Sequence, residues 1–434
     1  KQRAVQDETF VPHMPRRPRC LHPLPPAATS PHPPMRFLHT ADWHLGKLLH
    51  GQHLTKDQEY LLDQVVDIAK EEEPDVVVVA GDVYDRSVPP AEAVELLDDV
   101  LTRLVVDIGV PVVAIRGNHD SADRLDFGSS ILQRQGLHVF SKLRDTPGHV
   151  TFEDEHGPVH FVGFPFAEPA LARQVFGNKE IRSHDDILAA QVASANIPDG
   201  ERAIAVAHVF ARGGDLADSE RHLTVGGAET VHASRFSRFC YTALGHLHRR
   251  QQIQLTGADT AEEDDTTGEA GSAIIPPHVR YSGSIMKYSF NETHHDKSVH
   301  LVEVDAEGEC SVETIGLELR RDLRRIEGTM EEVLAGPDDG EDPDDYLWVT
   351  LTDDGPVHDA MTRIREVYPN ALHVERPRRV ETNELQQLTG DASTMRVDDI
   401  FEQFFTYVTG QDDLPDTHRE ILAEALERSA KETD

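Results

Sequence analysis

Five short apolar runs in this chain each end in side chains that can bind a metal ion. The clearest run, residues 76–80, continues into Gly81-Asp82-Val83-Tyr84-Asp85. A run of this kind is typical of a buried parallel strand, and open α/β sheets bind their ligands where such strands end. Carboxylate, amide and imidazole groups suit Mn²⁺, Fe²⁺ or Zn²⁺, so the sequence predicts a metal centre. The other four runs end in the following residues: Asp42 and His44; Asn118 and His119; His208; and His246 and His248.

The endings differ in how strongly each one alone indicates a metal ligand. His246 and His248 lie two residues apart, so in an extended segment their side chains point the same way and can bind together. Asp82 alone could be a turn residue, and a lone histidine such as His208 is commonly a loop residue without a metal. The repetition of the arrangement along the chain favours a metal centre over scattered polar loop residues.

The order of these motifs, D-x-H, G-D-x-x-D, G-N-H-D, a lone His and G-H-x-H, resembles the calcineurin-like metallophosphoesterases. Residues 36–46, RFLHTADWHLG, narrow the resemblance to SbcD, the bacterial family of DNA double-strand-break repair nucleases. The GHLH motif at 245–248 and the later Tyr281-Ser282-Gly283-Ser284 are similar to the same family. The resemblance is strong over residues 35–300 and looser beyond them.

This resemblance implies a two-metal site for phosphodiester hydrolysis. Such esters resist water because the phosphate is anionic and the leaving alkoxide is poor, and two cations about 3.5–4 Å apart address both problems. We choose Asp82 as the carboxylate that bridges the ions, which are expected to be two Mn²⁺, with Mg²⁺ or another divalent ion as the alternative. The remaining ligands that the resemblance implies are, for one ion, Asp42, His44 and His248 and, for the other, Asn118, His208 and His246.

His119 and Asp120 are expected to be catalytic. A histidine that is held by a carboxylate can stay cationic and deliver a proton. The resemblance implies that His119 assists departure of the leaving oxygen, and the alternatives are a further metal ligand or a structural His–Asp pair. Some relatives carry a second histidine where this chain has Asp85, so a scheme with two catalytic histidines is in doubt.

The function implied by the resemblance is that of a DNA nuclease subunit in end processing, repair, recombination and replication. It would be a 3′→5′ exonuclease on double strands and an endonuclease on single strands or hairpins. A coiled-coil ATPase, SbcC, is the implied partner, with a homodimer inside a heterotetramer. The chain lacks a G-x-x-x-x-G-K-[ST] loop, so ATP should bind to that partner. The alternatives are a phosphodiesterase of small nucleotides and a scaffold that tethers a partner at DNA ends without catalysis.

Apolar periodicity predicts the pattern β-α-β-α-β over residues 36–120, which implies a parallel sheet. Thr55-x-x-Gln58 has the pattern of a capping box at the first helix, and Pro90 suits the first turn of the second. The resemblance implies an α/β fold: the calcineurin-like metallophosphoesterase β-sandwich flanked by helices, then a small α/β capping domain and C-terminal partner-binding helices. The apolar faces expected for the two helices are Leu61, Leu62, Val65, Val66 and Ala69, and Val94, Leu97, Leu101 and Leu104.

Changes in composition divide the chain into five predicted parts. Residues 1–34 are rich in Pro and are expected to be disordered. Residues 35–316 should form the nuclease domain, and residues 317–380 the capping domain with which SbcD-like nucleases hold DNA. A polar linker, 381–393, then leads to two helices in 394–434 that we expect to bind the ATPase.

The last of these parts carries an apolar stripe at three- and four-residue spacing, which predicts an amphipathic helix. Thr417-x-x-Glu420 resembles the capping box of a second helix. These helices could instead pack on the chain's own capping domain. The stripe consists of Val397, Ile400, Phe401, Phe404, Phe405 and Val408.

The cysteine content and the net charge of the chain bear on its cellular compartment and on how it binds DNA. The three cysteines, Cys20, Cys240 and Cys310, are far apart, which argues against a disulfide framework and favours a reducing cytoplasm. No apolar run is long enough to span a membrane. A net charge of −36 is unusual for a DNA enzyme, and we interpret it as halophilic adaptation to a salt-rich cytosol. The alternative is an ordinary acidic protein whose DNA contacts come mainly from its partner.

If the acidity reflects a salt-rich cytosol, the melting temperature should rise steeply between about 0.1 M and about 2 M KCl. The reason is that the screening length falls below about 3 Å over that range, so the repulsion between carboxylates is removed. Thermal unfolding followed by circular dichroism measures this shift. A melting temperature that does not change with KCl would favour the ordinary acidic protein.

Overall fold

The computed structural model describes residues 34–215, 229–253, 278–353, 355 and 357–376. The expected N-terminal extension up to residue 33, the linker and the C-terminal helices lie outside the described residues. The chain divides into two units, residues 1–324 with 344–346, and residues 325–343 with 347–434. Each unit is described by itself.

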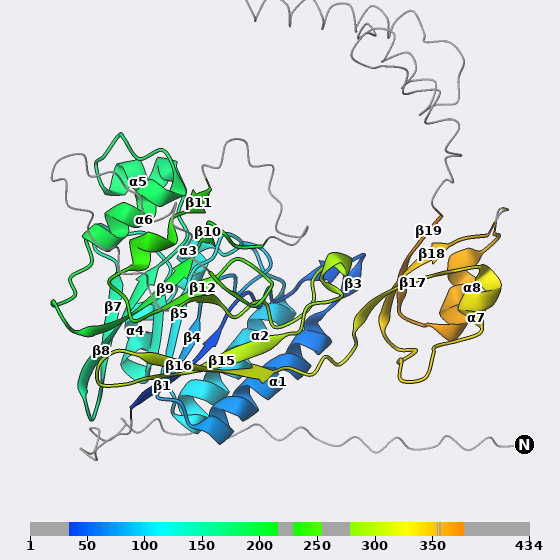
Figure 1. The fold of residues 1–434 in the computed structure, drawn as a ribbon, viewed down its shortest axis with the longest axis horizontal. Helices are drawn as coiled ribbons and strands as arrows, with labels where there is room; N and C mark the ends of the chain where they lie inside the picture. Colours follow the sequence, from blue (N-terminus) through cyan, green and yellow to red (C-terminus); the bar gives the residue numbers. More distant parts are fainter. Residues whose placement is uncertain (1–33, 216–228, 254–277, 354, 356, 377–434) are drawn as a thin grey trace, which may run out of the picture. The chain divides into compact units, whose positions relative to one another are not determined.

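The first unit contains a six-stranded sheet with the order β16-β15-β1-β4-β5-β6 (Figure 1). Four neighbouring strands are parallel, of which the first three are the strands predicted over residues 36–120: β1 Met35–Thr40, β4 Val76–Val79, β5 Val112–Ile115 and β6 Leu137–Phe140. Two antiparallel strands, β15 Ser298–Val304 and β16 Cys310–Gly316, complete the edge beside β1.

A second six-stranded sheet has the order β13-β14-β12-β9-β8-β7. Its parallel centre is formed by β8 Gly157–Phe164, β9 Arg202–His208, β12 Tyr241–Gly245 and β14 Val279–Tyr281. The antiparallel edges are β7 Gly148–Asp154, which forms a hairpin with β8, and β13 Gln251–Gln252.

The two sheets pack face to face, which makes the predicted β-sandwich. Alternate residues of each strand point to opposite faces, so Phe37, Val76 and Val78 enter the core between the sheets. There the Phe37 ring lies edge-on against the rings of Phe161 and Tyr241, with centroids 5.4 Å apart in both pairs. A second core fills the other face of the β9–β12 sheet.

Helices connect the parallel strands. The first, α1 Thr55–Glu72, buries the apolar face predicted for it, Leu61 to Ala69. The second, α2 Ala91–Thr102, continues as a π-helical turn, Arg103–Ile108. Shorter helices are α3 Ala122–Leu125, α4 Ser129–Leu132, α5 Pro169–Val175 and α6 His184–Ala193, with single 3₁₀ turns at Gln133–Gln135, Ala233–Phe236 and Phe290–Glu292.

Two local predictions about these helices are wrong. Thr55 is not the N-cap of α1, because the helix begins after Leu54 without a side-chain cap, and Gln58 is used elsewhere. In α2 the buried face is Ala93, Leu96 and Val100, whereas Val94 is 45% exposed. The run around α2 has apolar residues on adjacent positions, so the periodicity alone permitted either face.

The second unit is a small α/β layer whose elements occur in the predicted order. A three-stranded sheet is made of β17 Leu323–Gly328, β18 Tyr346–Leu351 and β19 Ala371–Glu375, in that order. Its helices are α7 Met330–Leu334, which a Thr329 capping box begins, and α8 Ala360–Val367. Leu347, Val349 and Ile364 form the centre of its apolar core.

Short strand pairs lie outside the large sheets. They are β2 Leu48–Leu49 with β3 Gln52–His53, and β10 Phe210–Ala211 with β11 Thr230–Val231. An isolated bridge also joins Leu45 to Tyr84. Within the part of the chain that the structure describes, no helix is long and apolar enough to cross a membrane.

Candidate metal centre

The carboxyl ends of strands from both sheets meet at one end of the sandwich. In the first sheet, β1 leads into Asp42 and His44, β4 into Asp82, and β5 into Asn118. In the second sheet, β9 ends at His208, and β12 leads into His246 and His248. The structure therefore brings together the seven residues that the sequence singled out as metal ligands.

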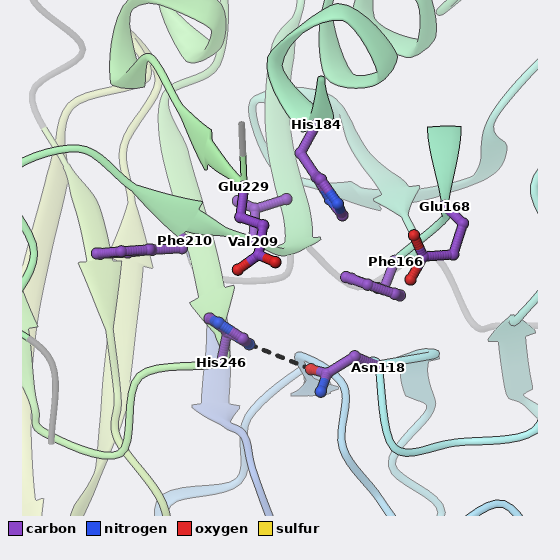
Figure 2. Close-up of a pocket in the computed structure, with 8 residues that line it drawn as sticks. All are labelled: Asn118, Phe166, Glu168, His184, Val209, Phe210, Glu229 and His246. Carbon is purple, nitrogen blue, oxygen red and sulfur yellow. Dashed lines mark hydrogen bonds between the residues drawn. The ribbon is translucent and has the colours of Figure 1, made fainter. Parts of the chain in front are cut away.

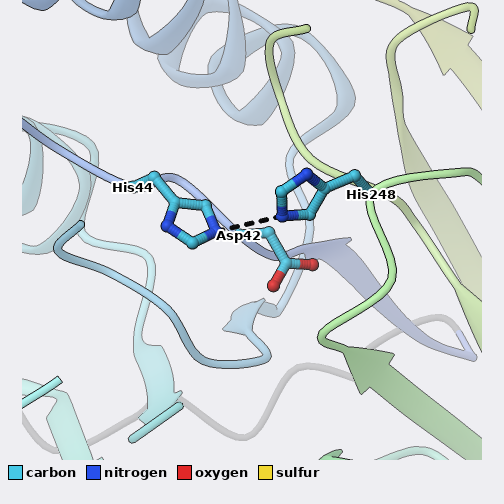
Figure 3. Close-up of side chains that lie close together, drawn as sticks. All are labelled: Asp42, His44 and His248. Atoms are coloured by element: carbon cyan, nitrogen blue, oxygen red, sulfur yellow. Dashed lines mark hydrogen bonds between the residues drawn. The ribbon is translucent and has the colours of Figure 1, made fainter. Parts of the chain in front are cut away.

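Three overlapping groups of side chains offer ligand atoms that lie within 4.8 Å of one another. The first is Asp42, His44 and His248, in which the Nε2 atoms of the two histidines are 3.1 Å apart (Figure 3). The second is Asp42, Asp82 and His208, and the third is His44, Asp82 and His119. Asp82 and Asp42 belong to more than one group, so carboxylates lie at the centre of the cluster.

Asp82 lies between His44 and His208. Its Oδ1 accepts a hydrogen bond from the backbone N–H of His119 at 2.9 Å. Its Oδ2 lies 3.6 Å from Nε2 of His44 and 3.4 Å from Nε2 of His208. One oxygen is thus held by the backbone, and the other lies between histidines that we assign to different ions.

Asn118 links the remaining ligands. Its Oδ1 lies 2.9 Å from Nε2 of His208 and 3.1 Å from Nδ1 of His246. The other ring nitrogen of His208, Nδ1, is 2.9 Å from the carbonyl oxygen of Ala80. A carbonyl can only accept, so Nδ1 of His208 carries a proton, and Nε2 is the ring nitrogen that faces Asn118 and Asp82.

The backbone at these ligands is strained. Four of the non-glycine residues with positive φ among the described ones are expected ligands: Asp42 (52°), His44 (45°), Asp82 (47°) and His246 (104°). Such conformations cost roughly 1–3 kcal/mol each and persist where the surroundings enforce them, commonly at functional sites. The strain thus independently indicates that these positions are held for chemistry.

Close packing beneath the ligands requires glycine at two positions. A Cβ atom at Gly117 would lie 2.1 Å from Oδ1 of Asp82, and one at Gly245 would lie 1.9 Å from the Ala80 carbonyl. Any side chain at either position would displace the Asp82 loop. Gly245 therefore allows the end of β12 to approach β4 of the other sheet, and Gly117 allows the loop after β5 to approach the loop after β4 in the same sheet.

Asp120 does not hold the His119 ring, which corrects the pairing that we expected from the sequence. Its carboxylate accepts backbone hydrogen bonds from Val83 at 3.1 Å, Tyr84 at 2.8 Å and Gly117 at 3.0 Å. Asp120 is therefore a positioning residue that ties the β4 and β5 loops together. The Nδ1 of His119 instead donates to the carbonyl oxygen of Asp85 at 2.7 Å.

Burial and mutual proximity shift the pKa values at the centre. Burial raises the pKa of Asp42 to about 7 and lowers that of His44 to about 4. Burial alone would lower the pKa of His208, but the Asp82 and Asp42 carboxylates outweigh it and raise the value to about 9. Burial likewise acts to raise the pKa of Asp82, yet His208 and its neighbours hold it well below the usual value. These directions describe a buried cluster in which the neighbouring histidines keep the Asp82 carboxylate ionised.

A buried ion pair behind His248 escaped the sequence reasoning. Glu292 is fully buried and its carboxylate lies 3.1 Å from Nδ1 of His248 and 2.7 Å from Nζ of Lys297. Lys297 also donates to the His248 carbonyl at 3.1 Å and to Oγ of Ser284 at 2.8 Å. A carboxylate on one ring nitrogen orients a histidine and makes the other nitrogen a better metal ligand. No motif near Glu292 could have pointed to this role.

Gln58, expected in a helix cap, supports the loop that carries Asp42 and His44. Its side-chain amide donates to the carbonyl oxygens of Trp43 at 3.1 Å and His44 at 2.7 Å, and its Oε1 accepts from the Gly46 N–H at 3.1 Å. The residue is completely buried. Its polar groups satisfy a loop whose backbone is not part of a sheet.

The donor set fits a divalent metal. Oδ2 of Asp42 is buried and has no hydrogen-bond partner, although nearly all buried polar atoms in proteins have one. A hydrogen bond holds Nδ1 of His208, and the other nitrogen of that ring, Nε2, is directed at the cluster. Carboxylate, amide and imidazole together suit Mn²⁺, Fe²⁺ or Zn²⁺.

Comparison with known proteins shows two family matches. The calcineurin-like phosphoesterase family matches residues 35–249, and the type 5 capsule protein repressor C-terminal domain matches residues 319–409. The first match contains the seven expected ligands and His119. The second begins within the segment that joins the two structural units.

Similar individual proteins span most of the chain. The SbcD component of the nuclease SbcCD from Staphylococcus saprophyticus is 31% identical over 379 residues, which cover 87% of this chain and 94% of that protein. The same component from Staphylococcus epidermidis is 31% identical and covers 78% of this chain and 84% of its own length. Among solved structures, a dimetal phosphatase from Danio rerio is 13% identical, with a TM-score of 0.36, and covers 65% of this chain and 96% of its own.

Proposed function

Since this chain belongs to the SbcD family of nuclease subunits, we propose that it is the metal-dependent DNA nuclease component of an SbcCD-type complex. Its substrate activities would be 3′→5′ exonuclease action on double strands and endonuclease action on single strands or hairpins, in DNA end processing, repair and recombination. The observation that carries the proposal is the convergence of the seven expected ligand side chains, Asp82 among them, at the joined ends of two sheets.

The ligands divide into two sets that share Asp82. We propose that Asp42, His44 and His248 hold one Mn²⁺ and that Asn118, His208 and His246 hold the other, because the first three form one close group and Asn118 contacts both remaining histidines. Two such ions supply a hydroxide nucleophile and stabilise the charge on the attacking and leaving oxygens.

Side chains that are not proposed as metal ligands would position the ligand loops and deliver a proton. Asp120 and Gln58 keep the ligand loops in place through backbone hydrogen bonds. His119 is half-buried at the edge of the cluster, with its ring centroid 4.8 Å from that of His44. Its Nδ1–H is fixed on the Asp85 carbonyl, so Nε2 is the atom that would deliver a proton to the leaving oxygen.

Hydrolysis by the full-length protein with Mn²⁺ tests this proposal. Linear duplex, a DNA hairpin and bis-p-nitrophenyl phosphate should all be cleaved. Cleavage of the small ester without cleavage of DNA would favour a phosphodiesterase of small nucleotides. No cleavage of any substrate by a metal-loaded protein would favour a non-catalytic scaffold.

A coiled-coil ATPase is the proposed partner, because the two Staphylococcus relatives are named as components of SbcCD. We propose that residues 394–434 bind it and that the small α/β unit caps DNA. A nuclease of this kind would meet its DNA in the cytoplasm, which is the location that we propose.

Deleting residues 394–434 should abolish co-purification with the ATPase while Mn²⁺-dependent cleavage of short single strands is retained. The reason is that the apolar stripe of this segment would bury three phenylalanines against the partner. Phe401→Glu with Phe405→Glu should have the same effect, and Gln403→Glu, off the stripe, should not. Unchanged co-purification of the shortened chain would contradict the assignment, and loss of its solubility would indicate packing on the chain itself.

A homodimer is also part of the proposal. The apolar side chains that support it are Phe127, Ile131 and Leu132, which are 86%, 73% and 38% exposed and follow closely after His119. Exposed apolar groups so close together commonly mark a protein interface. The helices α1 and α2 expose fewer large apolar side chains, chiefly Tyr60 and Val94.

A further inference from the structure

A pocket of about 260 Å³ opens directly beside Asn118 and His246 (Figure 2). Ligand pockets usually measure about 300–1,000 Å³, so this one has room for a single ring system rather than for a whole nucleotide. Its outer wall comes from the segment after β8, from the first residue of α6 and from β10. None of these walls contributes an expected metal ligand, so the proposed reaction leaves the pocket without a role.

Two phenylalanine rings supply flat apolar surface in this pocket. Phe166 and Phe210 are both half-buried, and the Phe210 ring centroid lies 6.4 Å from that of His246. Phe166 is fixed to the metal loop, because its N–H donates to the Arg116 carbonyl at 3.1 Å, two residues before Asn118. Aromatic side chains held in this way are the usual surfaces on which nucleobases stack.

The polar groups of the pocket select against a phosphate. In Figure 2 the carboxylates of Glu168 and Glu229 and the ring of His184 converge above Asn118 and His246. Burial lowers the pKa of His184 although both carboxylates act in the opposite direction, so the ring adds little positive charge. Two carboxylates repel an anion, but they accept hydrogen bonds from amino groups.

A positive charge lies next to this acidic pocket. The guanidinium of Arg116 is 5.8 Å from the Phe166 ring centroid and is half-buried. A guanidinium is a preferred partner of phosphate oxygens. Base-binding surfaces and a phosphate-binding cation therefore occur together within a few residues of the proposed ligand Asn118.

We propose that this pocket binds the nucleobase adjacent to the scissile phosphate and favours bases with an exocyclic amino group. Phe166 and Phe210 would stack on the base, and Glu168 and Glu229 would accept from the amino group of cytosine, adenine or guanine. Thymine presents a carbonyl oxygen in place of that amino group, which the carboxylates repel. This inference rests on the proposed phosphodiesterase chemistry of the metal centre.

The test uses chromogenic esters that carry one base on a defined side. The 5′- and 3′-p-nitrophenyl esters of deoxycytidine and thymidine monophosphates are compared with bis-p-nitrophenyl phosphate, which has no base. On one of the two sides, kcat/KM of the full-length protein with Mn²⁺ should be roughly 5-fold or more higher for the cytosine ester than for the thymine ester, the low end of discrimination by one good contact.

Two variants assign this preference to the pocket. Phe210→Ala should lower kcat/KM for both base-containing esters by roughly 5- to 150-fold, mainly through KM, the range that stacking of one base spans. Glu168→Gln with Glu229→Gln should bring the cytosine and thymine rates together. Val106→Ala and Glu153→Gln, which change exposed residues outside the pocket, should alter neither quantity. The manganese content of every variant is measured in parallel.

The outcomes of these experiments distinguish a failure of this inference from a failure of the proposed function. No hydrolysis of bis-p-nitrophenyl phosphate by the metal-loaded protein would overturn the proposed function. Hydrolysis of that ester with equal kcat/KM for both bases would overturn the pocket alone. A cytosine preference that persists in the Glu168→Gln, Glu229→Gln protein would also overturn it.

Discussion

Replacing Asp82 with alanine should abolish hydrolysis of every substrate and remove the bound metal. Oδ2 of Asp82 lies 3.4 Å from Nε2 of His208 and 3.6 Å from Nε2 of His44, so one side chain faces both proposed ion sites. Its loss deprives both ions of a shared anionic ligand. Asp82→Asn should have the same effect on hydrolysis, because the amide keeps the shape of the side chain and loses its charge.

Plasma mass spectrometry of the purified protein measures the metal, and hydrolysis of plasmid DNA and bis-p-nitrophenyl phosphate measures activity. Asp98→Ala, which removes an exposed carboxylate from α2, is the matched control and should keep both metal and activity. A full complement of metal in the Asp82→Ala protein would show that Asp82 does not bridge the ions.

Replacing His119 with alanine should slow hydrolysis by about 10²–10⁴-fold, the usual contribution of a general acid, while the metal content stays nearly unchanged. The structure supports a role apart from the ligands, since Nδ1 of His119 is engaged by the Asp85 carbonyl at 2.7 Å. His119 nevertheless lies close enough to His44 and Asp82 to be a ligand, so metal content is the deciding measurement.

A substrate with a good leaving group provides a second test of whether His119 acts as a general acid. The rate of bis-p-nitrophenyl phosphate hydrolysis should fall much less than that of DNA, because p-nitrophenolate departs without a proton whereas an alkoxide does not. His53→Ala, at an exposed histidine in β3, is the control and should affect neither substrate. Loss of metal from His119→Ala as complete as that from Asp82→Ala would make His119 a ligand.

The sequence by itself determined the identity of the expected ligands and the elements that carry them. Each of β1, β4, β5, β9 and β12 is a continuous buried run that ends in polar residues, and this is a local pattern that needs no knowledge of the fold. The apolar face predicted for α1 is an equally local pattern, and the structure buries it.

Other features were decided only by the tertiary structure. The five strand ends belong to two different sheets, and whether they meet depends on how the sheets pack against each other. Asp120 follows His119 directly, which suggested a pair, but its carboxylate turns to the backbone of Val83 and Tyr84. A side chain's partners depend on which other segments are brought near it, and adjacency in sequence does not report them.

The same reason explains the residues that sequence reasoning missed or misassigned. Glu292 lies 44 residues after His248 in the sequence, and its carboxylate contacts the His248 ring. Gln58, in α1, donates hydrogen bonds to the carbonyl oxygens of Trp43 and His44 in the loop after β1. Neither contact has a periodic pattern or a motif, because each exists only after β1, β12 and α1 are packed. Ligand types are therefore properties of the sequence, whereas the hydrogen bonds that orient those ligands are properties of the packed sheets and helices.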